Sequence, residues 1–249
     1  LTVLNSDSKS CRICSTSEES SDMVVGPSGI NIERFDEKMK LEQNRRLVTY
    51  YSLLTQMRVN GGNDYINLVN SILSGKCNQQ ACLENYDFKV MSDFNRFNNL
   101  QQKLEDEFTL SRMIAGYAWE WKSKKDKSLY DMELDGVKKQ WNYRLENWVL
   151  SEGADKQVGC IHTIQGFDLN YGFVIMGNEI GYDPESKEII VRPENYYDQN
   201  GRKTASKEEL LEYIKHIYYV LMTRGIKGTY LYICDDNLRK YVSSIIGEI

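Results

Sequence analysis

The sequence contains no apolar run that approaches the roughly 20 residues needed to span a bilayer. Its first residues, LTVLNSDSKS, lack the basic segment followed by an apolar one that is typical of a signal peptide. The six cysteines, at positions 11, 14, 77, 82, 160 and 234, are too few and too irregularly spaced for a disulfide-stapled secreted scaffold. We therefore expect a soluble, cytoplasmic protein with no membrane partner. Because the first residue is Leu1 rather than Met, we also expect a fragment or a processed product.

Positive charge is scarce as well, since 31 Lys+Arg face 36 Asp+Glu and the net charge is −5. This balance excludes a protein that holds nucleic acid by bulk positive charge, so any contact with a polyanion must be local. The chain has 249 residues, of which 41% are hydrophobic. That is enough to bury a sizeable core, which excludes disorder of the chain as a whole.

A phosphate-binding P-loop, G-x4-G-K-[ST], is also missing. The pair Gly75-Lys76 is followed by Cys77, and Asn70 stands where the first glycine is needed. The run YLYICDD ends in two aspartates, as a magnesium-binding strand does. A strand followed by an aspartate that caps the next helix has the same pattern, and we prefer that interpretation.

Amphipathic segments alternate with short apolar runs, which predicts an α/β fold with a mostly parallel sheet flanked by helices. Helices are expected over about 34–58, 64–73, 93–107, 207–223 and 236–246. Strands are expected over 86–92, from 113 onward in MIAGYAW, and in GCIHTIQG, YGFVIMG, KEIIVRP and TYLYICDD. Residues 1–30 are expected to be a loop or leader, and 122–140 an exposed connection.

A cluster of polar residues lies between two apolar runs: His162, Thr163, Gln165, Gly166 and Asp168. Polar side chains packed at the end of a strand cost free energy unless they meet each other or a ligand. The cluster is therefore a candidate binding site, and a simple tight turn is the alternative.

Two further groups have both a functional and a structural interpretation. Trp119 and Trp121 precede Lys124 in a lysine-rich stretch, a pattern that suits stacking of single-stranded bases beside bound phosphates. Tryptophans of the core followed by a solvated loop would have the same sequence. Trp141 and Trp148 are assigned to the core. The pairs Cys11/Cys14 and Cys77/Cys82 each have a spacing that a zinc site tolerates. The long stretch of sequence between the two pairs leads us to expect no metal site.

Four segments in a fixed order carry a family resemblance: QMRVNGG at 56–62, AGYAWEW at 115–121, HTIQGFD at 162–168 and YYVLMTRGIKG at 218–228. Together they resemble the Schlafen-group-3-like DNA/RNA helicases. The third and fourth segments are similar to motifs V and VI of superfamily 1 helicases, and the first is similar to motif IV.

The resemblance implies the second RecA-like domain of a two-domain motor over 85–249, preceded at 31–84 by a helical connector or the end of the first RecA-like domain. The P-loop would then belong to the first domain, which becomes the expected partner together with DNA or RNA. ATP and Mg²⁺ would bind between the two domains of the complete parent, and neither is expected to bind tightly to this chain alone.

The resemblance also implies roles for single residues. Arg224 resembles the arginine that reaches the γ-phosphate, and Arg58 its companion from motif IV; a guanidinium suits this role because it stays charged and forks onto two oxygens. The residues expected near the nucleotide are Gln56, Gln165, Gly166 and Asp168, with Gln165 relaying between the cleft and the nucleic acid. His162 and Thr163 are expected near a strand phosphate. A non-catalytic nucleic-acid-binding or protein-interaction module on a degenerate helicase fold is the alternative.

Overall fold

The computed structural model describes residues 2–3, 11–12, 58–198 and 205–249. The chain divides after Met57 into two compact units. In the first unit, β1 (Thr2–Val3) pairs antiparallel with β2 (Cys11–Arg12). Most of the predicted leader, the predicted helix before Arg58 and the candidate residue Gln56 lie outside the described residues.

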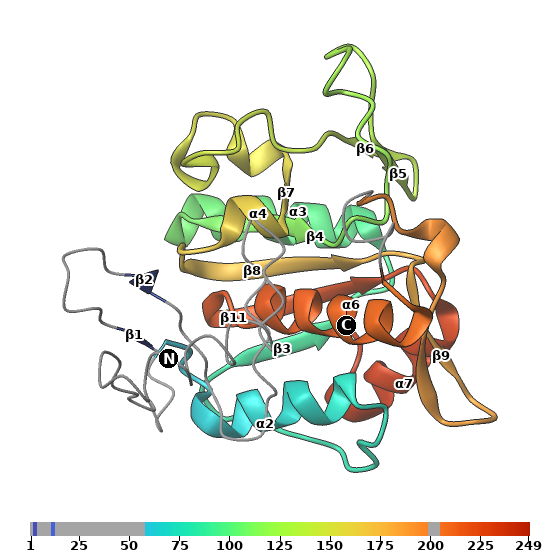
Figure 1. Ribbon diagram of the computed structural model, residues 1–249. Helices are drawn as coiled ribbons and strands as arrows, with labels where there is room; N and C mark the ends of the chain where they lie inside the picture. Colours follow the sequence, from blue (N-terminus) through green and yellow to red (C-terminus); the bar gives the residue numbers. More distant parts are fainter. Residues whose placement is uncertain (1, 4–10, 13–57, 199–204) are drawn as a thin grey trace, which may run out of the picture. The chain divides into compact units, whose positions relative to one another are not determined.

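Parallel strands form the central sheet of the second unit (Figure 1). In spatial order they are β3 (Asp87–Val90), β11 (Gly225–Ile233), β8 (Leu169–Met176), β4 (Ser111–Ala115) and β7 (Val158–Cys160). The helices of this unit are α2 (Gly62–Leu73), α3 (Phe94–Phe108), α4 (Ile161–Ile164), α6 (Lys207–Met222) and α7 (Asp236–Ile246). Three segments form short 3₁₀ helices: η1 (Trp148–Leu150), η2 (Ala154–Lys156) and η3 (Pro193–Asn195). The predicted α/β class with a parallel, RecA-like sheet is confirmed.

Successive strand residues point to opposite faces of the sheet, and both faces are buried because helices pack on each of them. In β11, Leu231 and Ile233 belong to the core that includes α2, α4, α6 and α7. Tyr230 and Tyr232 belong to the core on the other face, together with Phe97 of α3. This arrangement explains why the strands appear in the sequence as nearly continuous apolar runs.

The predicted helix starts are confirmed by their caps. The Ser206 side chain accepts a hydrogen bond from the Glu209 N–H, and the Glu209 carboxylate accepts one from the Ser206 N–H at 2.8 Å, which completes a capping box. At the start of α3, the Asp93 carboxylate accepts a hydrogen bond from the Arg96 N–H at 3.1 Å, without a reciprocal bond from residue 96. Asp235 caps α7 by accepting from the Leu238 N–H at 2.7 Å, which supports the cap interpretation of the run YLYICDD.

Several predicted strands need correction. KEIIVRP does not join the central sheet: β10 (Glu188–Val191) pairs antiparallel with β9 (Ile180–Asp183), because a short polar turn joins them directly. In GCIHTIQG the strand ends at Cys160 and α4 follows. In MIAGYAW the strand ends at Ala115, where the chain passes close to other side chains: a Cβ on Gly116 would lie 2.7 Å from Glu179 Oε1.

The stretch 122–140 is more than an exposed connection. It contains a hairpin of β5 (Met132–Leu134) and β6 (Val137–Lys139). The hairpin forms because Asp135 and Gly136 both adopt positive φ, 48° and 81°, as a two-residue hairpin turn requires. Met132 and Leu134 are buried, so this segment contributes to the core.

The second unit begins at Arg58, and within it α2 packs against α6. The predicted domain boundary at residues 84 and 85 stays a prediction. None of the helices in the described part of the chain has the length and apolar content that crossing a bilayer requires.

Candidate functional site

The turns that precede β8 and β11 lie side by side at the amino end of the sheet. Asp168 directly precedes β8 and Arg224 directly precedes β11. The first residues of the two strands, Leu169 and Gly225, are register partners, and the Leu169 N–H donates to the Arg224 carbonyl at 2.9 Å. Two residues that are far apart in the sequence are therefore brought to adjacent strand ends.

A third predicted residue joins this end of the sheet. Arg58 Nε lies 2.8 Å from Asp168 Oδ1 and forms an ion pair with it. Two residues later, the Asn60 N–H donates to the carbonyl of Ile226 in β11 at 2.9 Å. The segments similar to motifs IV, V and VI thus converge at the beginnings of β8 and β11.

The turn that presents Arg224 is held by buried hydroxyl groups. The Met222 carbonyl accepts hydrogen bonds from Tyr65 at 2.8 Å and from Thr229 at 3.0 Å. Tyr86 donates to the Gly225 carbonyl at 2.9 Å. The sequence analysis did not identify these three side chains. The sequence does indicate that a buried tyrosine needs a hydrogen-bond partner, but it does not indicate which group that partner is.

The glycines of this end allow close approach and a tight turn. A Cβ on Gly225 would lie 2.1 Å from the Gly228 carbonyl oxygen, so no larger residue fits there without a shift of the backbone. Gly166 has a φ of +86° and open space where a Cβ would be, so its requirement is conformational. The Arg224 side chain is partly buried and its Nε donates to the Val220 carbonyl at 3.2 Å. This hydrogen bond ties the Arg224 guanidinium to the last turn of α6.

The residues expected to contact nucleic acid lie at the other end of the sheet. His162 and Thr163 belong to α4, which begins at the carboxyl end of β7. The Thr163 hydroxyl is buried and donates to the Cys160 carbonyl at 2.9 Å, so it supports α4. His162 Nδ1 is buried and has no hydrogen-bond partner within the described residues. The segment similar to motif V therefore connects the two ends of the sheet, and Gln165 within it is partly buried.

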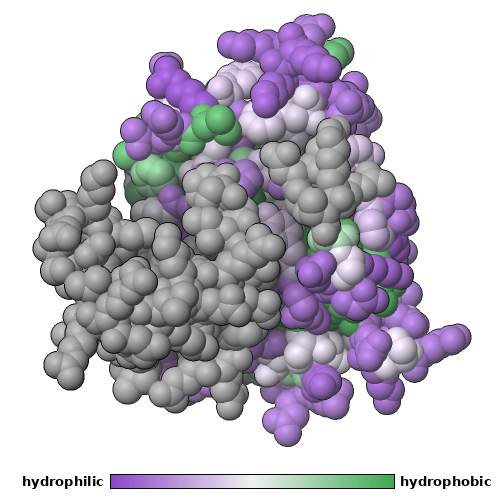
Figure 2. Space-filling view, viewed as in Figure 1, coloured by the Kyte–Doolittle hydropathy of each residue, from purple (hydrophilic) through white to green (hydrophobic). Residues whose placement is uncertain are grey.

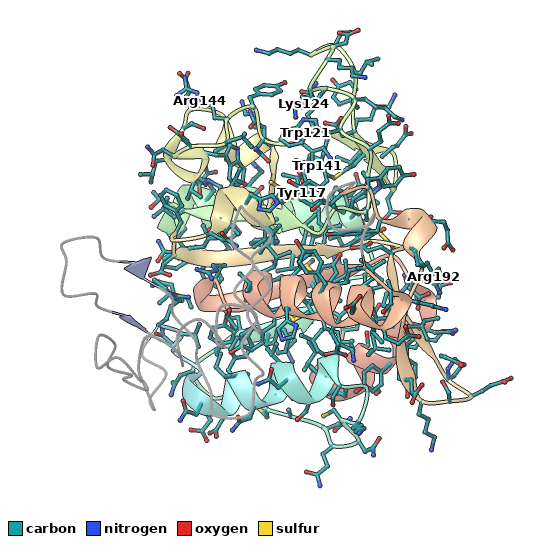
Figure 3. All side chains as sticks on the ribbon, in the orientation of Figure 1. Tyr117, Trp121, Lys124, Trp141, Arg144 and Arg192 are labelled. Carbon is teal, nitrogen blue, oxygen red and sulfur yellow. The ribbon has the colours of Figure 1, made fainter. Side chains whose placement is uncertain are left out.

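A row of aromatic rings leads outward from His162. Its ring centroid lies 5.7 Å from that of Tyr117, which lies 5.8 Å from that of Trp141. The Trp141 ring lies 6.2 Å from Trp121, and Lys124 Nζ lies 5.6 Å from the centroid of Trp121 (Figure 3). Trp119 also contacts Trp141 and, like Trp121, is partly buried. The predicted core positions of Trp141 and Trp148 are confirmed, since both are fully buried.

A buried carboxyl group lies at the carboxyl end of β8. Glu179 is fully buried and accepts a hydrogen bond from the Tyr218 hydroxyl, which in turn accepts one from the Gly177 N–H at 3.1 Å. Burial raises the pKa of Glu179 to about 7, and the hydrogen bond from Tyr218 opposes this shift only in part. Glu179 Oε2 has no hydrogen-bond partner within the described residues.

No group of at least three histidine, cysteine, aspartate or glutamate residues in the described ranges is arranged to hold a metal ion. Cys77 and Cys82 are free thiols, the first partly buried and the second exposed, and the Cys77 Sγ lies 3.8 Å from the Gln79 carbonyl oxygen. Cys14 and the side chain of Cys11 lie outside the described residues, so the four-thiolate zinc alternative stays untested.

Comparison with known proteins gives two matches. The profile of the family described as "Schlafen group 3, DNA/RNA helicase domain" matches residues 15–235. An uncharacterized protein of Saccharomyces cerevisiae is 31% identical over 215 residues, which cover 77% of this chain and 47% of the yeast protein. The chain thus spans about half the length of this relative. No solved structure matches.

Proposed function

Because the chain belongs to the Schlafen group 3 DNA/RNA helicase domain family, we propose that it is the second RecA-like half of a superfamily 1-like ATP-dependent helicase or translocase. In this proposal the chain supplies the residues of motifs IV, V and VI to an ATP cleft. The P-loop is supplied by a first RecA-like domain outside this chain. Free cysteines in the described part of the chain support a reducing, cytoplasmic location.

The observation that carries the proposal is the convergence of Arg58, Asp168 and Arg224 at the beginnings of β8 and β11. Arg58 and Arg224 place two guanidinium groups at the amino end of the sheet. Such groups stay charged at every physiological pH and bind two phosphate oxygens at once. The amino end of the sheet therefore suits a triphosphate that another domain holds against it.

Arg224 is assigned the role of stabilising the negative charge that develops on the transferred phosphoryl group. Arg58 supports the same cleft and fixes Asp168, which is assigned to the nucleotide sugar. Magnesium would neutralise charge on the phosphates. The described residues offer arginines to the phosphates and no cluster of carboxylates to the metal, so we assign the metal ligands to the first domain. The chain alone should then hydrolyse almost no ATP.

The test is the nucleic-acid-stimulated ATPase of the full-length parent protein with Arg224→Ala and Arg224→Lys. Loss of the arginine should lower turnover on the order of 10³-fold, and lysine should rescue little because it lacks the planar fork. Arg96→Ala is the matched control, since Arg96 is exposed on α3. Unchanged turnover in both Arg224 variants would remove the proposed role.

A non-catalytic nucleic-acid-binding module is the second candidate. The observation that favours it is the Arg58–Asp168 ion pair, because two groups assigned to the nucleotide already neutralise each other. A full-length protein that binds DNA or RNA without any nucleic-acid-stimulated ATPase would support this candidate over the motor.

A further inference from the structure

The segment between β4 and β7 forms a distinct outer surface above the sheet edge (Figure 1). It carries the hairpin β5–β6, whose Met132 and Leu134 are buried beneath it. Asp135, at the hairpin turn, accepts hydrogen bonds from the Phe94 N–H at 2.8 Å and from the Tyr232 hydroxyl at 3.2 Å. The hairpin is therefore fixed to α3 and β11, and the surface it carries is anchored to the core.

Three lysines on this surface lie over aromatic rings. The distances from ammonium nitrogen to ring centroid are 5.6 Å for Lys124 and Trp121, 5.4 Å for Lys127 and Tyr143, and 6.0 Å for Lys138 and Tyr130. We call these six residues the basic aromatic face. Tyr130 and Tyr143 are 53% and 48% exposed, so their rings are not needed to fill the core. In Figure 2 the outer end of the molecule that carries this face is mostly hydrophilic.

Buried polar groups hold the face in place. The buried Asp131 carboxylate accepts hydrogen bonds from the Ser123 backbone N–H at 2.8 Å, the Ser123 hydroxyl at 2.6 Å and the Trp141 backbone N–H at 2.8 Å. These bonds fix the beginning of the lysine-rich loop next to a fully buried tryptophan. A loop fixed before binding loses less conformational entropy when a ligand binds.

Gln140 connects the two partners of one lysine–aromatic pair. Its Nε2 donates to the carbonyl of Lys127 at 2.8 Å and to that of Leu129 at 2.7 Å, and its Oε1 accepts a hydrogen bond from the Tyr143 hydroxyl. One side chain therefore sets both the backbone that carries Lys127 and the orientation of the Tyr143 ring. Gln140 is a positioning residue for this pair.

The lysine-rich loop carries a net charge opposite in sign to that of the whole protein. The segment KSKKDKSLY, at 122–130, holds four lysines and one aspartate in a chain whose net charge is −5. The aspartate, Asp126, accepts hydrogen bonds from the Ser128 N–H at 2.9 Å and hydroxyl at 2.7 Å, which lower its pKa. Next to this loop, Lys127, Tyr143, Arg144 and Glu152 border a hollow of the surface. A concentrated basic patch on an acidic protein is suited to a polyanion.

We propose that the basic aromatic face binds a single strand of DNA or RNA. Unpaired bases stack on Trp121, Tyr130 and Tyr143, and the lysines paired with these rings contact the phosphates between the bases. A single strand is specified because the bases of a duplex are stacked on each other and do not offer their faces. The inference rests on the proposed function, which it deepens by assigning the place where the strand passes over the outer surface of the domain.

The test measures binding of labelled single-stranded DNA, single-stranded RNA and duplex DNA to the full-length parent protein by fluorescence anisotropy at several salt concentrations. Tyr130→Leu and Tyr143→Leu remove stacking with little change of bulk, and each should weaken single-strand binding at least fivefold. Lys127→Gln should reduce the slope of log affinity against log salt by about 0.7. Gln140→Leu should weaken binding in the same direction as Tyr143→Leu, and its salt slope should stay closer to wild type than that of Lys127→Gln.

Matched controls come from the same chain. Tyr197→Leu removes an exposed tyrosine outside the face, and Lys76→Gln and Lys240→Gln remove exposed lysines elsewhere. These variants should bind as wild type does. Thermal unfolding of every variant confirms that the fold is intact before its binding is compared.

Three outcomes would overturn the inference. If the wild type binds single strands and the face variants bind like the controls, the strand lies elsewhere and the proposed function stands. If duplex binds as tightly as single strand, or polyglutamate competes as well as DNA, the face is a simple charge patch. If the wild type binds no nucleic acid even at low salt, both the inference and the nucleic-acid part of the proposed function fail.

Discussion

The Arg58 guanidinium and the Asp168 carboxylate form an ion pair, with 2.8 Å between Nε and Oδ1, that joins the first residue of the second unit to the turn before β8. The side chains are 34% and 47% exposed, so water screens the attraction. Such a pair contributes at most about 1 kcal/mol to the free energy of unfolding. Its significance is therefore in holding two candidate site residues in place.

Asp168→Asn tests this distinction. The substitution should change the free energy of unfolding by less than about 1 kcal/mol. In the proposed motor it should lower the ATPase of the full-length protein by roughly 10²-fold. The uncharged amide no longer holds Arg58 in place, and misplacing a guanidinium near the reacting phosphate costs rate far more than stability. Urea unfolding and steady-state ATPase assays measure the two effects.

A second surface ion pair provides the control. Asp236 Oδ1 lies 2.6 Å from Arg239 Nη2, and the Asp236 side chain is 72% exposed. Asp236→Asn should have a similarly small effect on unfolding and should leave the ATPase unchanged. Equal ATPase in the two variants would show that the Arg58–Asp168 pair is only a surface contact.

Tyr86→Phe probes the hydrogen bonds behind Arg224. The Tyr86 hydroxyl lies 2.9 Å from the Gly225 carbonyl oxygen and 2.8 Å from Thr229 Oγ1, and both contacts are buried. Removing it leaves buried polar groups without this partner, which should lower the free energy of unfolding by about 1–3 kcal/mol. Urea unfolding checks the prediction, with Tyr197→Phe as a control because Tyr197 is 45% exposed. Equal midpoints for the two variants would contradict it.

The elements that the sequence predicted well are those that depend on local pattern. The α6 capping box needs only Ser206 and Glu209 at the correct spacing, and the buried strands needed only apolar runs between turn residues. The hairpin β5–β6 was also encoded locally, by Asp135-Gly136, but its short strands lie in a charged stretch that favoured an exposed loop.

The candidate site depends on contacts between distant segments, which local patterns do not specify. Family resemblance placed Arg58, Asp168 and Arg224 in one cleft, and the ion pair and strand register bring their segments together. The supporting hydroxyls of Tyr65 and Tyr86 could not be predicted, because any buried tyrosine satisfies the same sequence pattern. Only the three-dimensional structure shows that both serve the turn around Arg224.

Ser206→Ala should destabilise the helix that ends next to Arg224. The Ser206 hydroxyl accepts from the Glu209 N–H at 3.2 Å, and alanine removes this bond together with the reciprocal geometry of the capping box. The expected loss is about 1 kcal/mol in the free energy of unfolding. Chemical denaturation monitored by circular dichroism measures it. Ser206→Asp, which keeps a capping oxygen, should retain most of the stability, and a loss as large as that of alanine would contradict the capping role.

The buried Glu179 carboxyl group should make the free energy of unfolding depend on pH. Its pKa in the folded protein is raised from 4.5 to about 7 by burial. The folded state therefore holds a proton that the unfolded state releases near pH 4.5. This proton contributes to the free energy of unfolding. The contribution is complete below the pKa of Glu179 in the unfolded state, 4.5, and is lost as the pH rises through the pKa in the folded state, about 7. The total loss is at most about 3 kcal/mol. The fully buried Tyr218 stays protonated over this range, because burial and the neighbouring Glu179 raise its pKa, and it donates to the carboxyl group throughout.

Glu179→Gln isolates this contribution. The neutral amide keeps an oxygen that accepts from Tyr218 and cannot ionise, so the unfolding free energy of the variant should decline less than that of wild type between about pH 4.5 and 7. At pH 8 the variant should be as stable as wild type or more so, because burying a neutral group costs less than burying a carboxylate. Urea unfolding at half-unit pH steps measures the difference, with Glu185→Gln as the control because Glu185 is exposed. Parallel curves for wild type and Glu179→Gln would mean that this carboxyl group titrates as it does in water, and that the buried pair with Tyr218 does not control its proton.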